Sequence, residues 1–363
     1  MSVARAILEL ARWAPSGDNT QPWRFELVGD DHVVVHAFDT RRHCVYDLDG
    51  EASQLSVGAL LETIRIAASV HGLAARVTRR TDEPDELPVF DVQLVQVDGI
   101  AADPLHAFVR VRSVQRRPLS TRRLDAADKA RLEKAVAGEH RVVWFESVAE
   151  RLRLARLAAM TAKIRLTTPE AYAVHREVIE WNARFSEDRI PDQALGASAL
   201  SLRSMRWAMA SWRRVQRMNR YFGGTVAPRL ELDLVPGLRC GAHFALLAQR
   251  PGTGIGHQVK AGAAVQRFWL TATSQRLQVQ PQYTPLVFAA YARRQLAFTA
   301  DSAAFAQARR VRNVLEDLLG ADAESAVFLG RIGHGNAAVA RSLRLPLERL
   351  MWSAEAARDR RTP

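Results

Sequence analysis

Cysteine is scarce in this chain of 363 residues, which contains only Cys44 and Cys240. The two cysteines are far apart in the sequence and form neither a CxxC pair nor the start of a zinc-binding pattern. The ten histidines also lack the close spacing of metal ligands. We therefore expect two free thiols and predict that the protein has no metal site.

Long hydrophobic runs are missing as well. No apolar stretch approaches the ~20 residues that a membrane-spanning helix needs. Residues 1–13 mix acidic and basic side chains in an amphipathic pattern, unlike the apolar centre of a signal peptide. With 48% hydrophobic and 25% charged residues, the composition is that of a soluble globular protein. We expect a cytoplasmic protein without stable membrane insertion, long enough for two domains or for an internal duplication.

Lysine is the scarcest charged residue, because four of the 51 basic residues are lysines and the rest are arginines. The net charge of +12 raises the question of nucleic-acid binding. However, the sequence has no zinc-finger spacing, no RNA-recognition aromatic motif and no evident helix-turn-helix. We therefore expect no nucleic-acid partner and prefer a basic pocket for a phosphorylated small molecule.

Hydrophobic periodicity predicts a chain that mixes helices with short strands. Its main features are a hairpin at residues 25–37 and two long helices, over 51–72 and about 258–276. Residues 148–222 are expected to be mostly helical. The remaining predicted elements are helices over 3–13, 125–137 and 311–319, a helix from Pro104 into residues 110–123, a helix from Pro346, strands over 74–79, 89–97, 140–145, 244–248 and 326–329, and a loop over 330–344.

The two long helices have similar beginnings. Ser56-Val57-Gly58-Ala59-Leu60-Leu61 in the first can be aligned with Val259-Lys260-Ala261-Gly262-Ala263-Ala264 in the second. Both stretches combine small residues with an apolar face, and both helices lead to a strand. Taken alone, this similarity is a weak indication of an internal duplication.

Residues 200–222 form a basic amphipathic pattern. Apolar side chains such as Met205, Trp212 and Met218 recur on one face, and arginines occupy much of the rest. Such a helix can lie on a membrane surface, but it is more often packed on its own protein. We expect the second arrangement, and the role of the segment stays open.

The most informative stretch is Ala14-Pro15-Ser16-Gly17-Asp18-Asn19-Thr20-Gln21-Pro22-Trp23. A helix end followed by a turn needs some of these residue types, but it does not need their order. Ser16, Asn19 and Gln21 place neutral hydrogen-bonding groups on a short turn, and such groups suit a planar heterocycle with alternating donors and acceptors. The two prolines stiffen the turn, so that less entropy is lost on binding. The order therefore predicts a small-molecule site.

Two arginine-rich segments have the chemistry to hold a phosphate. Three arginines and a serine stand together in Arg112-Ser113-Val114-Gln115-Arg116-Arg117, and Arg341 and Arg344 follow near the C-terminus. Guanidinium groups bind phosphate oxygens in a bidentate manner. Each segment alone is more typical of a solvated surface, so that its interpretation depends on the first motif.

Together, the three segments resemble the nitroreductase superfamily of FMN-dependent oxidoreductases. In that family one motif contacts the isoalloxazine and ribityl groups, an arginine segment holds the phosphate, and a C-terminal arginine closes on it. The residues that match these motifs, and that the resemblance implies bind FMN, are Pro15, Ser16, Asn19, Gln21, Arg112, Ser113, Arg116, Arg341 and Arg344. Residues 270–281 are also similar to the helix and loop beside the flavin. The implied fold is α+β, with central antiparallel sheets flanked by helices.

The order of the segments differs from that of an ordinary nitroreductase, in which the arginine segment comes first and two subunits enclose each flavin. Here the Pro-Ser-Asn-Gln-Pro-Trp motif comes first, the arginine segment begins only at Arg112, and no second copy of the motif follows. The resemblance thus implies a fused pseudo-dimer. It is similar to the duplicated nitroreductase-like proteins of the actinobacterial dormancy-associated type and to the nitroreductase-like domains fused to ThiF-type adenylyltransferases. The expected halves are residues 1–105 and 106–363, with a lid-like helical insert at about 150–235.

The resemblance implies an enzyme that takes electrons from NAD(P)H and reduces a nitroaromatic, a quinone or another unsaturated small molecule, with the flavin performing the redox chemistry. No side-chain nucleophile or acid–base pair stands out, so no catalytic residue is assigned. Val114, Leu119 and His334 depart from the residues common in the family. The alternative is an FMN-binding storage protein whose lid occludes the site. Both a monomer and a homodimer of such a pseudo-dimer are compatible with the sequence.

Overall fold

The computed structural model describes residues 2–353 and contains two four-stranded antiparallel sheets. The first consists, from edge to edge, of β1 (Trp23–Leu27), β2 (His32–Ala37), β4 (Val89–Gln96) and β3 (Leu73–Arg79). The second consists of β5 (His140–Phe145), β9 (Ala242–Ala248), β11 (Ala326–His334) and β10 (Leu277–Pro281). Counted along the chain, both sheets have the order first, second, fourth, third strand. The two sheets therefore share one topology.

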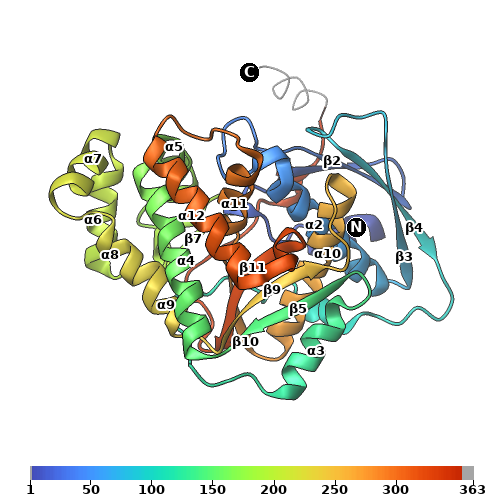
Figure 1. Ribbon diagram of the computed structural model, residues 1–363. Helices are drawn as coiled ribbons and strands as arrows, with labels where there is room; N and C mark the ends of the chain where they lie inside the picture. The colour runs from blue at the N-terminus through green and yellow to red at the C-terminus, as the bar shows by residue number, and fades with distance from the viewer. Residues whose placement is uncertain (1, 354–363) are drawn as a thin grey trace.

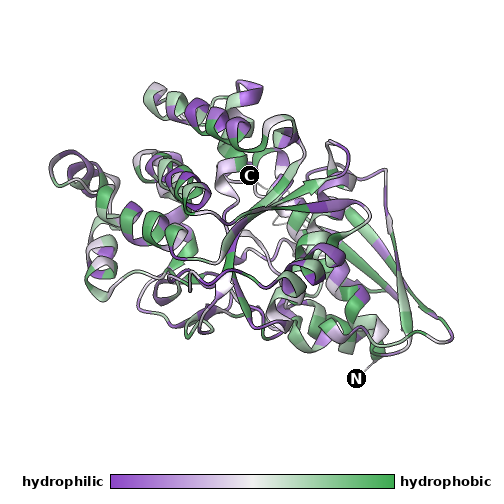
Figure 2. Cartoon of the chain, turned by 60° about the horizontal axis from the view of Figure 1, so that its bottom comes forward, coloured by the Kyte–Doolittle hydropathy of each residue, from purple (hydrophilic) through white to green (hydrophobic). Residues whose placement is uncertain are grey.

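A long helix connects the second strand of each sheet with the third. α2 (Glu51–Ser69) packs on the first sheet, and α10 (Ile255–Ser274) packs on the second. Both helices are buried around most of their circumference, which explains why their sequences are apolar on more than one face. They lie side by side and join the two sheets (Figure 1). Hydrophobic colour runs along the strands of the sheets in Figure 2.

The contact between α2 and α10 is reciprocal. Gly58 lies against the carbonyl of Val259, and Gly262 lies against the carbonyl of Leu55. The stretch Leu55–Gly58 is thus matched with Val259–Gly262. This register differs by one residue from the alignment expected from the sequence, because several small residues stand together and composition does not decide which of them lies at the crossing.

Residues 146–241 form a helical segment that connects β5 with β9, the first and second strands of the second sheet. In the first sheet, the equivalent strands β1 and β2 are connected by a short turn. The first helix of the segment, α4 (Val148–Thr167), begins with a capping box of Ser147 and Glu150. α4 packs with α11 (Thr284–Arg294) and α12 (Ser302–Leu319) on the second sheet and therefore belongs to the core. The helices that follow are α5 (Pro169–Val178), α6 (Ala199–Met209), α7 (Trp212–Tyr221), α8 (Val226–Pro228), a wide helical turn (Arg229–Leu234) and α9 (Val235–Leu238).

Short strand pairs attach the helical segment to the C-terminal arginines. β12 (Arg341–Ser342) pairs with β7 (Phe185–Ser186) in parallel, and β6 (Ile179–Glu180) pairs with β8 (Ile190–Pro191). Two stretches far apart in the sequence are thereby fixed to each other. The remaining helices are α1 (Val3–Ala11), α3 (Ala126–Val136), α13 (Leu347–Leu350) and single turns at Gly17–Asn19, Leu48–Gly50, Pro104–Phe108, Asp192–Ala194 and Gly320–Glu324.

The helix expected to run from Pro104 into residues 110–123 is wrong beyond its first turn, because only Pro104–Phe108 is helical. The buried guanidinium of Arg331 on β11 donates hydrogen bonds to the carbonyls of Gln115, Arg116 and Arg117. These carbonyls are therefore paired with a side chain of the second sheet instead of with N–H groups of a helix. The backbone nitrogen of Gln115 donates to Val279 of β10 at 3.1 Å, so that the segment runs along the edge of the second sheet.

Residues 277–281 form β10, the strand expected after the second long helix, where the resemblance had implied a loop. β11 continues to His334, inside the loop expected over 330–344, so that prediction is wrong at its start. α11 was not predicted. Isolated short apolar runs do not distinguish an edge strand from a loop, and cross-strand hydrogen bonds decide between them.

The basic segment 200–222 consists of two helices, α6 and α7, because Ser211 interrupts the pattern and caps α7 by accepting a hydrogen bond from the Arg214 nitrogen. Every residue from 198 to 235 is at least partly exposed. The apolar face predicted from the sequence is half-buried, and α7 packs on α5 through Trp212 and Tyr172. The segment is therefore packed on its own protein, as expected, although none of its residues is fully buried. Among residues 2–353, none of the helices is both long enough and apolar enough to cross a bilayer.

Candidate functional site

A cavity of about 330 Å³ lies where the N-terminal motif, the arginine segments and the helical segment meet. Both halves of the chain contribute residues to its lining. Ser56 belongs to α2, Trp269 to α10 and Arg165 to α4. Of the residues predicted for the site, those that line this cavity are Pro15, Ser16, Asn19, Arg112, Ser113, Arg116, Arg341 and Arg344. Gln21 is the predicted residue that does not. The structure thus brings together segments that are separated by more than half of the chain.

The loop that carries the first motif has a strained backbone. Asp18, Asn19 and Gln21 have φ angles of 47°, 63° and 47°, in the left-handed region. Each such residue costs on the order of 1–3 kcal/mol and persists only where its surroundings fix it. The Ser16 hydroxyl accepts a hydrogen bond from the Gln21 nitrogen at 3.0 Å and closes the loop. Strain of this kind is concentrated at functional sites.

Gln21 is fully buried and connects three parts of the chain. Its side-chain oxygen accepts a hydrogen bond from the Leu345 nitrogen at 2.9 Å. Its side-chain nitrogen donates to the carbonyl of Glu187 at 2.9 Å and to that of Asn19 at 3.1 Å. Gln21 therefore fixes the loop to the helical segment and to the stretch after Arg344. It stabilises residues that line the cavity without lining the cavity itself.

Two buried arginines and one half-buried arginine form a cationic cluster at the cavity. Arg112 and Arg344 are 4% and 8% exposed, and Arg341 is half-buried beside them. Burial, and then the charges of Arg344 and Arg341, lower the pKa of Arg112 well below its usual range. Burial, followed by Arg341 and Arg12, lowers the pKa of Arg344 to about 9. Within residues 2–353, none of the three forms an ion pair with a carboxylate.

The same arginines are held in place by neutral groups. Arg112 donates to the carbonyl of Trp13 at 3.2 Å and lies over the ring of Trp269, with 4.5 Å between the guanidinium carbon and the ring centre. Arg344 donates to the carbonyl of Ala14 at 2.9 Å. The buried Nε atoms of Arg112 and Arg341 have no hydrogen-bond partner among the described residues. The cluster is thus oriented but electrostatically uncompensated, which favours binding of an anion.

Arg116 faces a second group of charges. It donates to the carbonyl of Ala194 at 3.2 Å and lies near Asp18 and Arg165. Burial raises the pKa of Asp18, and the positive charges of Arg116 and Arg165 oppose the increase. Burial also raises the pKa of Asp233 to about 6, although Arg165 lies 3.2 Å away. This part of the cavity therefore has mixed charge.

Sequence reasoning missed most of this second group. Asp18 lies inside the motif that was recognised, and its charge could have been noted there. Arg165 and Asp233 belong to opposite ends of the helical segment, and their sequence neighbourhoods contain nothing that distinguishes them from surface residues.

Tyr46 and His175 form a hydrogen-bonded pair in the cavity wall, with 2.9 Å between the phenol oxygen and Nε2. Burial, and then the charge of Arg165, lowers the pKa of His175 to about 3, so that its ring is neutral near neutral pH. Burial raises the pKa of the Tyr46 hydroxyl. Both groups are therefore uncharged hydrogen-bonding partners for a ligand in the cavity.

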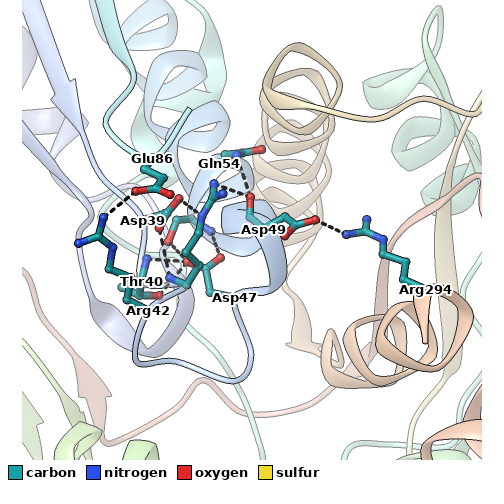
Figure 3. Close-up of polar contacts among 10 residues, drawn as sticks. Asp39, Thr40, Arg42, Asp47, Asp49, Gln54, Glu86 and Arg294 are labelled. Carbon is teal, nitrogen blue, oxygen red and sulfur yellow. Dashed lines mark hydrogen bonds and ion pairs between the residues drawn. The ribbon is translucent and has the colours of Figure 1, made fainter. Parts of the chain in front are cut away.

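The carboxylate of Asp47, next to Tyr46 in the sequence, is buried within a network of polar contacts (Figure 3). Asp47 accepts hydrogen bonds from the backbone and hydroxyl of both Thr40 and Ser53, at 2.6–3.0 Å. Arg294 of α11 reaches Asp49 and Glu51 across the two halves. The network fixes the start of α2, and with it Ser56, whose hydroxyl accepts from the Gly17 nitrogen at 3.3 Å.

The fold is α+β, and its cavity is lined by the cluster of Arg112, Arg341 and Arg344, which has no carboxylate partner among the described residues. No protein-family model matches the chain. The chain is similar to a protein of Mycobacterium tuberculosis named "Putative NAD(P)H nitroreductase acg", at 29% identity over 211 residues, which are 55% of this chain and 60% of that protein. A second, uncharacterized protein of that organism is 28% identical over 202 residues, 53% of this chain and 57% of its own length. The chain thus matches about three fifths of the length of these relatives.

Proposed function

We propose that the cavity binds FMN and that the protein uses NAD(P)H to reduce a small molecule such as a nitroaromatic, a quinone or another unsaturated compound. The observation that carries the proposal is the cluster of Arg112, Arg341 and Arg344, which lines one cavity and has no carboxylate partner among the described residues. The strained loop with Ser16 and Asn19 lies in the same cavity. Similarity to a relative named as an NAD(P)H nitroreductase adds to it.

The residues present fit this cofactor. A phosphate would supply acceptors for the Nε atoms of Arg112 and Arg341 and would compensate the charge of the cluster. The side-chain oxygen of Asn19, which is buried and has no hydrogen-bond partner in residues 2–353, could accept from a heterocyclic NH group. A cavity of about 330 Å³ is within the usual range for small-molecule sites.

When it is bound, the flavin supplies the hydride-transfer chemistry. The arginine cluster would hold its phosphate, and Trp269 would keep Arg112 oriented by stacking. The loop from Pro15 to Asn19 would position the ring system. Tyr46 and His175 would offer neutral hydrogen bonds to the second substrate, and the helical segment, through Ala158 and Ile190, would exclude water.

We also propose that the chain arose as a fused pseudo-dimer with halves near 1–105 and 106–363. Identical strand order in the two sheets supports this, as does the reciprocal crossing of α2 and α10. In an interface with two-fold symmetry every contact occurs twice, once in each direction between the two halves. The cavity draws the Asn19 loop from one half and Arg112 from the other.

The second candidate function is FMN storage with little turnover. It is favoured by one observation, that Arg165, Ala194 and Asp233 of the helical segment form part of the cavity wall. A cavity covered in this way would retain a flavin and restrict the entry of a nicotinamide.

The absorbance spectrum of the protein as purified tests the cofactor directly. Flavin bands that remain after gel filtration are the expected result, and a colourless protein that does not take up added FMN would contradict the proposal. Anaerobic addition of NADPH then separates the two functions. Loss of the visible flavin absorbance supports the reductase, whereas an unchanged spectrum of the FMN-loaded protein supports storage.

A further inference from the structure

The part of the helical segment that projects furthest carries charge of one sign. We call residues 198–230, with α6, α7 and α8, the outer lobe; it lies away from both sheets (Figure 1). Between Asp192 and Glu231 the sequence has no acidic residue and no lysine. The arginines in this stretch are Arg203, Arg206, Arg213, Arg214, Arg217, Arg220 and Arg229. These seven charges account for more than half of the net charge of +12.

Large apolar side chains are exposed among these arginines. Leu200 is 76% exposed, Trp207 52%, Tyr221 67% and Phe222 75%. Leu200 and Trp207 are seven residues apart on α6 and therefore lie on one face of that helix. Monomeric proteins usually do not leave several large apolar side chains exposed in one region unless the region binds something.

Arginines lie directly on the exposed rings. The guanidinium of Arg214 is 5.0 Å from the ring of Trp207, and that of Arg220 is 5.5 Å from the ring of Tyr221. Each pair places a positive charge beside an amphipathic aromatic side chain. This combination suits the boundary between lipid headgroups and acyl chains, where the ring enters the apolar layer and the charge stays at the phosphates.

The lobe is attached to the protein through its other side. The ring of Tyr172 on α5 packs on Trp212 with 5.4 Å between ring centres, and its hydroxyl donates to the Met209 carbonyl at 3.1 Å. Asn219 donates to the carbonyl of Leu166 at 2.7 Å. These contacts fix the orientation of α6 and α7. They leave Leu200, Trp207 and Phe222 outside the protein's own core.

We propose that the outer lobe docks the protein peripherally on membranes that contain anionic phospholipids. Apart from Arg229, which lies near Asp233, the seven arginines form no ion pair among the described residues and supply attraction to the headgroups. The exposed aromatic and aliphatic side chains supply apolar burial. A nucleic-acid backbone would satisfy the arginines but would leave Leu200 and the aliphatic part of the lobe in water. The lipid surface accounts for both features. The inference does not depend on the cofactor in the cavity.

Vesicle co-sedimentation of the full chain tests the proposal. Vesicles of phosphatidylcholine with phosphatidylglycerol should sediment the protein, vesicles of phosphatidylcholine alone should not, and salt should weaken the binding. The double variant Arg213→Glu/Arg217→Glu on exposed positions of α7 should lose at least about tenfold in affinity. The matched control Arg309→Glu/Arg310→Glu changes the net charge equally on exposed positions of α12 and should bind like the wild type.

A second variant tests the apolar contribution at constant charge. Tyr221→Ser/Phe222→Ser should weaken binding to anionic vesicles, and circular dichroism verifies that each variant is folded. Equal loss of binding in both arginine variants would overturn the proposal, since net charge alone would then explain it. It would also be overturned by absence of vesicle binding, including the case in which the lobe binds a DNA duplex instead.

Discussion

Gly58 of α2 and Gly262 of α10 occupy equivalent places in the contact between the two halves, because each lies against the backbone carbonyl of the residue three positions before the other. The same relationship extends along the helices. Gln266 donates to the hydroxyl of Thr63 at 2.8 Å, and Arg267 donates to Glu62 at 2.8 Å. Glu62 and Gln266 are separated by as many positions as Gly58 and Gly262, and so are Thr63 and Arg267. The two hydrogen bonds are therefore equivalent in the two halves. A pair of glycines therefore sets how closely the helices approach.

Substituting either glycine by alanine should destabilise the protein. A Cβ at Gly58 or Gly262 would overlap a backbone carbonyl that cannot move aside. We expect a loss of about 1–3 kcal/mol in the free energy of unfolding for either Gly58→Ala or Gly262→Ala, measured by urea titration. Gly256→Ala is the control on the same helix, since its Cβ would meet open space, and it should change stability by less than about 1 kcal/mol. Equal effects at all three positions would contradict the close crossing.

How much of the fold the sequence predicts depends on how local the determining contacts are. The helices over Val3–Ala11, Glu51–Ser69 and Ala126–Val136 and the strand His140–Phe145 follow from periodicity and caps within each element. The segment after Phe108 does not, because a guanidinium from β11, more than two hundred residues later, occupies its carbonyls. Long-range hydrogen bonds of this kind leave no local pattern.

The candidate site likewise contains residues that local motifs predict and residues that only long-range packing brings together. Ser16, Asn19, Arg112 and Arg344 come from separate motifs and line one cavity, while their binding of a cofactor stays a prediction. Gln21 belongs to the same motif, yet its amide is used by backbone groups, and only the folded arrangement reveals that. The charged group around Arg165 and Asp233 was missed, since tertiary packing alone brings these residues to the cavity. Motifs identify residue types, and packing decides which of them line the cavity.

The arginine cluster should discriminate between FMN and riboflavin. Arg112→Gln removes one charge-assisted donor to the phosphate, which corresponds to a loss of about ten- to a hundredfold in FMN affinity. Riboflavin has no phosphate, so its affinity should stay the same. Fluorescence quenching of each flavin on titration with protein measures both dissociation constants.

Two further measurements make this prediction specific. Arg110→Gln, at an exposed position two residues away, should bind FMN like the wild type. The FMN-free Arg112→Gln protein should not lose thermal stability, because the substitution removes a buried charge that lacks a carboxylate partner. Parallel losses for FMN and riboflavin would show that Arg112 does not contact the phosphate.

His175 should make stability depend on pH below the usual imidazole range. Its pKa of about 3 in the folded protein, caused by burial and then by Arg165, lies below 6.5 in the unfolded chain. Between these values the unfolded state binds more protons than the folded state, so stability falls as the pH falls. From pH 7.5 to pH 5 the contribution of His175 should decrease by roughly 2 kcal/mol.

The comparison with His175→Gln isolates this contribution. Asp233 acts in the opposite direction, because burial raises its pKa to about 6 and the folded state then binds more protons between about pH 4 and 6. Both proteins contain Asp233, so its effect cancels when the wild type and the variant are compared. Urea unfolding of both proteins at pH 7.5 and pH 5 therefore measures the contribution of His175 to the change in stability. The wild type should lose more stability than the variant, and equal losses would mean that His175 is protonated in the folded protein.

Gln21→Leu should weaken the binding of FMN and riboflavin alike. The substitution keeps the position filled but leaves the buried Leu345 nitrogen without its acceptor and frees the loop from the carbonyl of Glu187. Such an unpaired group costs about 1–3 kcal/mol, and the strained φ angles at Asp18 and Asn19 would relax once the loop is released. Gln93→Leu, at an exposed position on β4, should leave both affinities unchanged. Gln21 acts through the loop, whereas Arg112 acts through the phosphate, so only the Gln21 variant should have a lower affinity for riboflavin. If Gln21→Leu lowered the affinity for FMN alone, Gln21 would lie at the phosphate instead.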